Sequence, residues 1–69
     1  MINPTYSDGT TVNVGDRIMT YDIDGSQVLG TVAYDETAMY QWYAVYDDGE
    51  EYAILDFNYI FKLNNQLNQ

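Results

Sequence analysis

Cysteine and histidine are both absent from this chain of 69 residues. Without them the chain has no disulfide or thiolate site, and it lacks the commonest metal ligand and general base. An N-terminal basic-then-apolar signal and long apolar runs are also missing, which predicts a soluble, cytoplasmic protein without a membrane-spanning segment. We therefore do not expect catalysis by a nucleophile–base pair or by a metal, and we expect no cofactor.

Positive charge is scarce as well, because Arg17 and Lys62 are the only basic side chains in the sequence. Eleven carboxylates, spread from Asp8 to Asp56, oppose them and give a formal net charge of −9. This charge repels nucleic acid and anionic lipid, so we expect direct contact with neither. It favours a partner protein with a basic surface, through an attraction that weakens as salt rises. The alternative is that the acidity only keeps a small protein soluble.

Turn signals alternate with short β-forming segments along the chain, a pattern that predicts a small all-β fold with five strands. The expected strands lie at 17–21, 28–34, 39–46, 52–55 and 60–63, after an extended segment at 11–14. Gly30 is expected to mark a bend or a bulge in the second strand. In the third, alternation puts Tyr40 and Trp42 on one face, with Trp42 in the core.

The C-terminal part of the chain has two possible readings. A tight turn at 56–59 followed by a last strand is one prediction. A helix is the competing prediction, because apolar residues from Phe57 to Leu67 have roughly helical spacing. The strand is preferred, because asparagines are frequent here and a strong helix cap is missing.

The stretch YAVYDDGEEYAIL, at 43–55, holds the clearest hairpin signal in the chain. Asp48 and Gly49 fit a two-residue turn, in which Asp47 would lie opposite Glu50. Two like charges opposed in this way cost about 0.2–1 kcal/mol. A turn needs one aspartate and one glycine, so the additional carboxylates indicate a binding site as well.

A second acidic turn, with the pattern DxDG at 22–25, is similar to the start of a calcium loop. Gln27 and Ala33 stand where such a loop requires glycine and glutamate. We therefore predict a hairpin turn at this point, and no metal site.

Three segments resemble the Tudor-type members of the SH3-like barrel superfamily. They are VGDRI at 14–18, DGSQVLGTV at 24–32 and YAVYDDGEEYAILDFNYI at 43–60. The resemblance implies a small five-stranded SH3-like barrel within residues 1–63, followed by a polar C-terminal tail at 64–69. It also implies that the acidic turns at 22–24 and 47–51 lie close to each other.

Tudor-type domains commonly read methylated lysine or arginine with an aromatic cage and an acidic residue. Carried onto this sequence, the cage position of the first strand falls on Tyr21 or Asp22, and the hairpin positions fall on Tyr46 and Asp48. Two further cage positions, at 28 and 50, carry valine and glutamate in place of aromatic residues. The resemblance thus supplies half of a cage.

Together these features predict a protein that binds and does not catalyse. The predicted partner-binding residues are Tyr21, Asp22, Asp24, Tyr46, Asp47, Asp48, Glu50 and Glu51. Our first hypothesis is a small inhibitor or regulator, of the kind that phages encode for the host cytoplasm, whose carboxylates mimic nucleic-acid charge on the basic surface of a nucleic-acid-binding protein. The alternative is a Tudor-like reader or adaptor for a basic peptide, either methylated or unmethylated. An exposed edge strand could also pair two copies as a homodimer.

Overall fold

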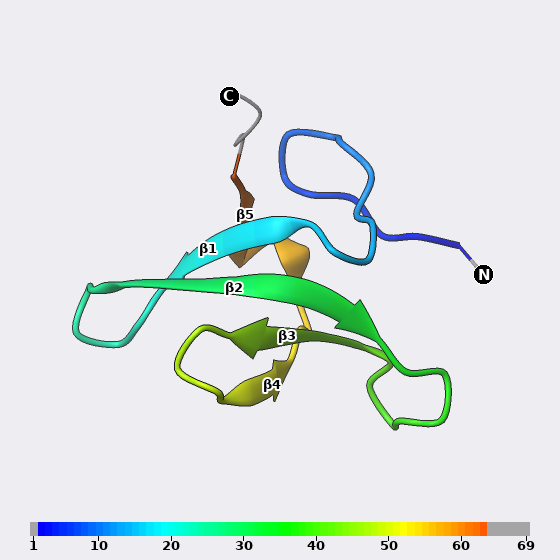
Figure 1. Cartoon of the computed structure of the whole chain (residues 1–69). Coiled ribbons are helices and arrows are strands. Elements are labelled where there is room, and N and C mark those ends of the chain that lie inside the picture. The colour runs from blue at the N-terminus through cyan, green and yellow to red at the C-terminus, as the bar shows by residue number, and fades with distance from the viewer. Residues whose placement is uncertain (1, 64–69) are drawn as a thin grey trace.

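A computed structural model describes residues 2–63 of the chain and shows a single antiparallel sheet of five strands (Figure 1). The elements are β1 (Arg17–Tyr21), β2 (Gln27–Tyr34), β3 (Trp42–Tyr46), β4 (Glu51–Ala53), the 3₁₀ helix η1 (Phe57–Tyr59) and β5 (Phe61–Lys62). Their order in the sheet is β4-β3-β2-β1-β5, so the sheet is not closed and β4 and β5 form its two edges. The predicted all-β class and the five strands are confirmed. Up to residue 63, the C-terminal segment ends in the predicted strand and does not form the competing long helix. The predicted tail lies outside the described residues.

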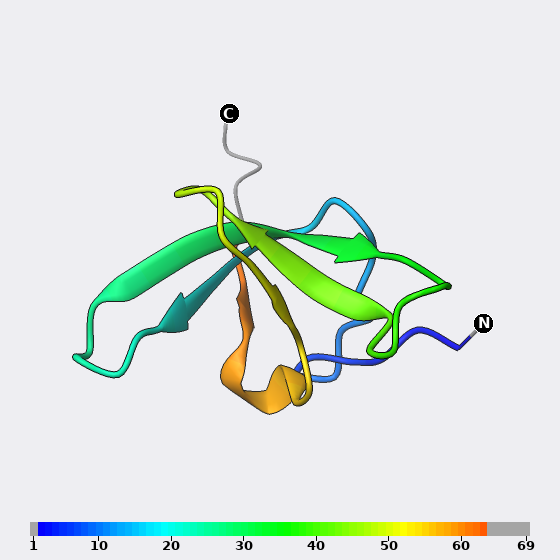
Figure 2. The same cartoon turned by 90° about the horizontal axis from the view of Figure 1, so that it is seen from below.

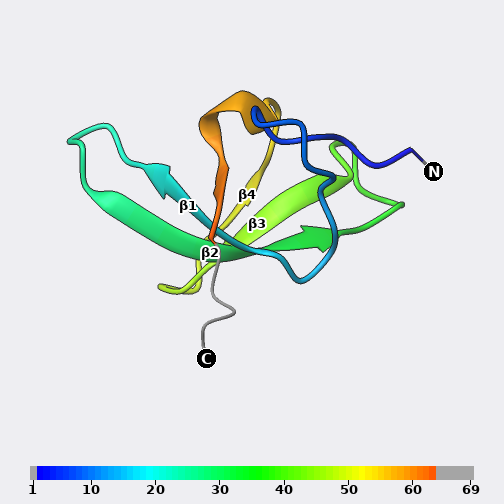
Figure 3. The same ribbon diagram turned by 90° about the horizontal axis from the view of Figure 1, so that it is seen from above.

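The core forms on the concave side of the sheet. Ile18 in β1, Val32 in β2 and Ala44 in β3 are fully or almost fully buried there. Figures 2 and 3 show the N-terminal segment and η1 on this concave side. Their buried residues are Tyr6, Val12 and Phe57, followed by Ile60 at the end of η1. Alternation along the strands thus supplies three of the seven buried core residues, and the two irregular segments supply the other four.

The N-terminal segment is a loop that folds back on itself. An isolated bridge joins Thr5 to Thr11, and the Val12 amide donates to the Pro4 carbonyl at 2.9 Å. This closure points both Tyr6 and Val12 into the core. The predicted extended segment at 11–14 is therefore a single bridge and a turn, and the sequence pattern gave no sign that Tyr6 is a core residue.

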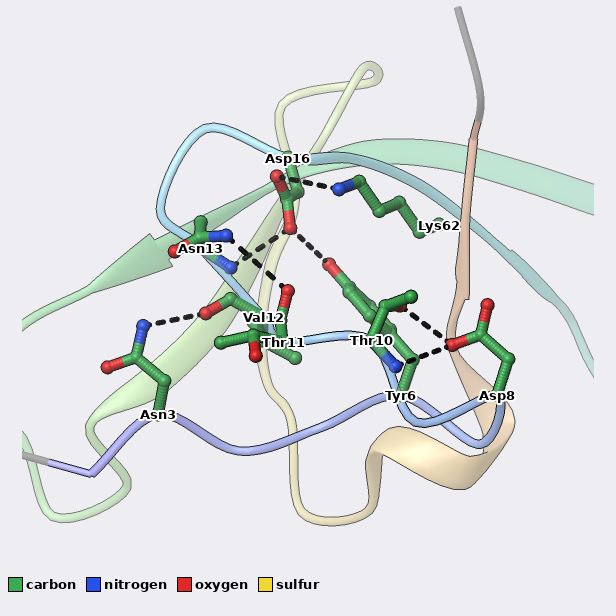
Figure 4. Close-up of polar contacts among 9 residues, drawn as sticks. All are labelled: Asn3, Tyr6, Asp8, Thr10, Thr11, Val12, Asn13, Asp16 and Lys62. Carbon is green, nitrogen blue, oxygen red and sulfur yellow. Dashed lines mark hydrogen bonds and ion pairs between the residues drawn. The ribbon is translucent and has the colours of Figure 1, made fainter.

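Asp16 joins this loop to the sheet (Figure 4). Its Oδ2 atom accepts from the Tyr6 hydroxyl at 2.8 Å and from the Asn13 amide at 2.9 Å. The Lys62 ammonium lies 3.8 Å from its other oxygen. Burial raises the pKa of Tyr6 far above its ordinary value, and the bond to Asp16 raises it further. The phenol is thus held in its neutral, donating form.

Replacing Tyr6 with phenylalanine is expected to lower the free energy of unfolding by about 1 kcal/mol, because the buried side of Asp16 loses a donor. Because the pKa is raised in the folded state, the contribution of this bond to stability is fully present below the ordinary tyrosine pKa of 10.0, and it is lost as pH rises from there through the higher pKa of the folded state. Urea unfolding should therefore show that the free energy of unfolding is higher for wild type than for Tyr6→Phe, and that this gap closes at alkaline pH. Tyr40→Phe, in an exposed loop, is the control, and a gap independent of pH would contradict this role.

Gly30 lies in the middle of β2 and is paired in regular register with Ile18 on one side and Tyr46 on the other. The predicted bend or bulge is therefore wrong. A Cβ atom at this position would lie 2.8 Å from Tyr46 Cδ1 and 2.9 Å from the Val45 carbonyl oxygen. The glycine is needed because the Tyr46 ring packs directly against the backbone of β2.

The third strand is shorter than predicted and begins at Trp42. Met39 and Tyr40 lie in the preceding loop and are exposed, so Tyr40 does not share a strand face with Trp42. Trp42 itself packs against the core, with ring centroids 4.9 Å from Tyr34 and 6.3 Å from Phe57.

Candidate functional site

The hairpin between β3 and β4 has a three-residue loop. Tyr46 lies opposite Glu50, with its amide donating to the Glu50 carbonyl at 2.8 Å, and Val45 pairs with Glu51. Gly49, at φ 93°, adopts the left-handed conformation that ends such loops. The predicted two-residue turn, with Asp47 opposite Glu50, is therefore wrong by one residue of register.

This register leaves Asp47 beside a cation. Its carboxylate accepts two hydrogen bonds from the Arg17 guanidinium, at 2.9 and 2.8 Å, and Arg17 also donates to the Thr31 hydroxyl at 2.9 Å. The Arg17 hydrogen bonds hold the pKa of Asp47 below its usual range. Asp47, a predicted partner-binding residue, is thus part of an ion pair that ties β1 to the hairpin.

An acidic groove lies between the β1–β2 hairpin and the β3–β4 hairpin, whose tips lie on the same side of the molecule in Figure 1. It has a volume of ≈ 310 Å³. Its lining residues are Thr20, Tyr21, Asp22, Val28, Tyr46, Asp48, Glu50 and Tyr52. Three tyrosines and three carboxylates therefore surround one hollow.

The groove gathers five of the eight residues that the sequence analysis proposed: Tyr21, Asp22, Tyr46, Asp48 and Glu50. Asp24, Asp47 and Glu51 do not line it. Asp24 accepts from the Ser26 amide and hydroxyl, and the hydroxyl bond in particular lowers the pKa of the Asp24 carboxyl. The role of Asp24 in the structure is thus to cap its turn.

Tyr52 is the groove residue that the sequence analysis missed. It pairs with Ala44, so its side chain lies on the concave face beside Tyr46. The two ring centroids are 6.0 Å apart, with the planes tilted by 51°. In the predicted register Tyr52 belonged to the opposite face, and the correct loop length would have been the signal that found it.

The hydroxyl of Tyr52 donates to Glu50 Oε1 at 2.7 Å. This bond raises the pKa of Tyr52, and burial raises the pKa of Tyr46. Both phenols therefore remain neutral at neutral pH and present uncharged aromatic faces. A ring face together with a nearby carboxylate is the combination that holds an organic cation.

The carboxylates that line the groove have no ion-pair partner among residues 2–63. Arg17 pairs with Asp47 and Lys62 with Asp16, and residues 2–63 contain no other lysine or arginine. The groove carboxylates are thus free to meet a cation from outside. Within the same residues, no group of three or more acidic side chains is placed to hold a metal ion.

Comparison of the chain with family models, with curated proteins and with solved structures gave no match. Among residues 2–63 no helix has the length and apolar character needed to cross a membrane.

Proposed function

We propose that this protein is a non-enzymatic binding protein with an SH3-like arrangement of strands, whose acidic groove receives a lysine or arginine side chain from the basic surface of a partner protein. The observation that carries the proposal is the groove, where Tyr46 and Tyr52 present ring faces beside Asp22, Asp48 and Glu50. A cation over such rings gains about 0.5–1 kcal/mol when exposed and about 2 kcal/mol when desolvated. The groove supplies both the rings and the compensating charge.

The acids outside the groove support a wider electrostatic role. At several turns a carboxylate accepts from the backbone amide two residues ahead, as do Asp8, Asp35 and Asp56. Hydrogen bonds from Thr10 and Thr37 lower the pKa of Asp8 and Asp35. These carboxylates are fixed in orientation and stay charged, as backbone phosphates do. This arrangement fits a regulator that occupies the nucleic-acid-binding surface of a cytoplasmic protein. A phage-encoded regulator that acts in the host cytoplasm is one example.

A Tudor-like reader of a methylated basic peptide is the second candidate, and Tyr52 favours it. This chain lacks the aromatic residue that the Tudor-type pattern expects at position 50, but Tyr52 brings a second ring to Tyr46 from two residues further on. Methylation removes hydrogen-bond donors from a cation and keeps its charge, so a reader should bind a methylated peptide more tightly.

Fluorescence polarisation with two Arg/Gly-rich peptides, one unmethylated and one dimethylated, tests both candidates. We expect salt-sensitive binding of the unmethylated peptide, a loss of about tenfold in Tyr52→Ala, and no loss in the control Tyr40→Ala. Tighter binding of the dimethylated peptide would favour the reader. An affinity equal in Tyr52→Ala and wild type would contradict the groove as the binding site.

A further inference from the structure

Strand β4 has an unpaired edge beside the acidic groove. It is the end strand of the sheet, and it forms the lower margin of the sheet in Figure 1. The Ile54 amide donates to the Trp42 carbonyl at 2.9 Å, and the Glu50 carbonyl accepts from Tyr46. Because an antiparallel strand alternates in direction, the backbone groups of Glu51 and Ala53 point away from β3. Within residues 2–63 no strand pairs with that edge.

We propose that an extended basic segment of the partner adds to β4 as a sixth, antiparallel strand and places a lysine or arginine opposite Tyr52. The inference rests on the proposed function, because it fills the same groove. An added strand would hydrogen-bond to the backbone of Glu51 and Ala53, which makes the residue opposite Tyr52 a non-hydrogen-bonded pair. Side chains in such pairs are close, with Cβ atoms about 4.5–5.5 Å apart. The cation would therefore lie on the Tyr52 ring, next to the Glu50 carboxylate.

The negative charge on this edge favours pairing with a basic segment over pairing with a second copy of the chain. All three residues of β4 are exposed, and Glu51 points to the face opposite Tyr52 because it pairs with Val45. Two copies joined through β4 would place two Glu51 carboxylates on one face of the same short seam and combine two chains that each carry a net charge of −9. A charge on an exposed edge is a common barrier to self-pairing. A basic segment would meet Glu51 favourably instead.

Backbone N-methylation of a peptide tests the added strand. The probe is the blocked peptide Thr-Val-Thr-Arg-Thr-Val-Thr, N-methylated either at the two threonines that flank the arginine or at the arginine itself. The flanking amides would face β4, so their methylation should weaken binding about tenfold, because two hydrogen bonds are lost. The arginine amide would face away, so its methylation should have no effect.

A matched change in the protein is Ala53→Pro, which removes one outward donor from an edge strand, a position that tolerates proline. Ala53→Pro should weaken binding of the unmethylated peptide several-fold. Tyr52→Ala should also weaken its binding, because the ring that contacts the arginine is lost. If the variant does not fold, the peptide series still decides. If the wild-type protein binds all the peptides with equal affinity and Tyr52→Ala still binds them weakly, the added strand is wrong and the groove remains the binding site. A peptide that does not bind at low salt would overturn the proposed function too. A wild-type dimer that Ala53→Pro dissolves, seen by sedimentation, would assign the edge to a second copy and overturn the inference.

Discussion

Replacing Gly30 with alanine is expected to lower the free energy of unfolding by about 1–3 kcal/mol, as overpacking of a core does. The new methyl group would lie within 3 Å of both the Tyr46 ring and the Val45 carbonyl oxygen. Movement of the Tyr46 ring relieves the first contact, whereas the second involves the backbone of β3, which can shift only by straining its pairing with β2. Because Tyr46 lines the acidic groove, the same substitution should also weaken binding of a basic peptide.

Urea unfolding measures the loss of stability, and NMR spectra of the tyrosine rings measure the displacement of Tyr46. Gly9→Ala is the matched control. Gly9 has a positive φ of 90° and no atom within 4 Å of the added methyl group, so it should cost stability through backbone strain alone. The Tyr46 signals should therefore move in Gly30→Ala and not in Gly9→Ala. A Gly30→Ala protein as stable as wild type, with unmoved Tyr46 signals, would refute this packing.

Neutralising the groove is expected to have the largest effect on binding. The triple variant Asp22→Asn, Asp48→Asn, Glu50→Gln should lose about 100-fold in affinity for an arginine-containing peptide at low salt, where each tenfold corresponds to about 1.4 kcal/mol. Asparagine at 48 and glutamine at 50 keep the acceptors that the Glu50 amide and the Tyr52 hydroxyl use. The fold should therefore persist, with higher stability at low salt because repulsion is relieved.

Calorimetric titration of the triple variant needs a control of equal charge. Asp8→Asn, Asp35→Asn and Asp56→Asn together make the same change in net charge at turns that do not line the groove. We expect this second triple variant to lose only a small part of the affinity, through weaker long-range attraction. An equal loss in both variants would show that total charge governs binding and would contradict a localised site.

The sequence was sufficient for the fold class, because alternation and turn signals are local. The strand at 17–21 was predicted with its observed bounds, and the second strand differs by one residue. The predicted register of the β3–β4 hairpin was wrong for a specific reason. A two-residue and a three-residue loop can both end on glycine, so Asp48-Gly49 is compatible with either, and the choice decides the face on which Tyr52 lies.

The structural roles of Asp47, Tyr6 and Asp24 depend on contacts that the sequence pattern does not show. Asp47 appeared free because its partner Arg17 lies 30 residues earlier in the sequence. Tyr6 was overlooked as a core residue because its loop has no periodic pattern, and its burial depends on the Thr5–Thr11 bridge. Asp24 was counted as a binding acid because its spacing to Ser26 was not recognised as a turn cap.

The most direct test of the central claim is an NMR titration of the isotope-labelled wild-type protein with the blocked arginine peptide, at low and at moderate salt. Our account predicts saturable shifts concentrated on the groove, at Tyr21, Tyr46 and Tyr52, with an affinity that falls as salt rises. Shifts spread over the distant acidic turns at Asp8 and Asp35, or no saturation at low salt, would contradict it.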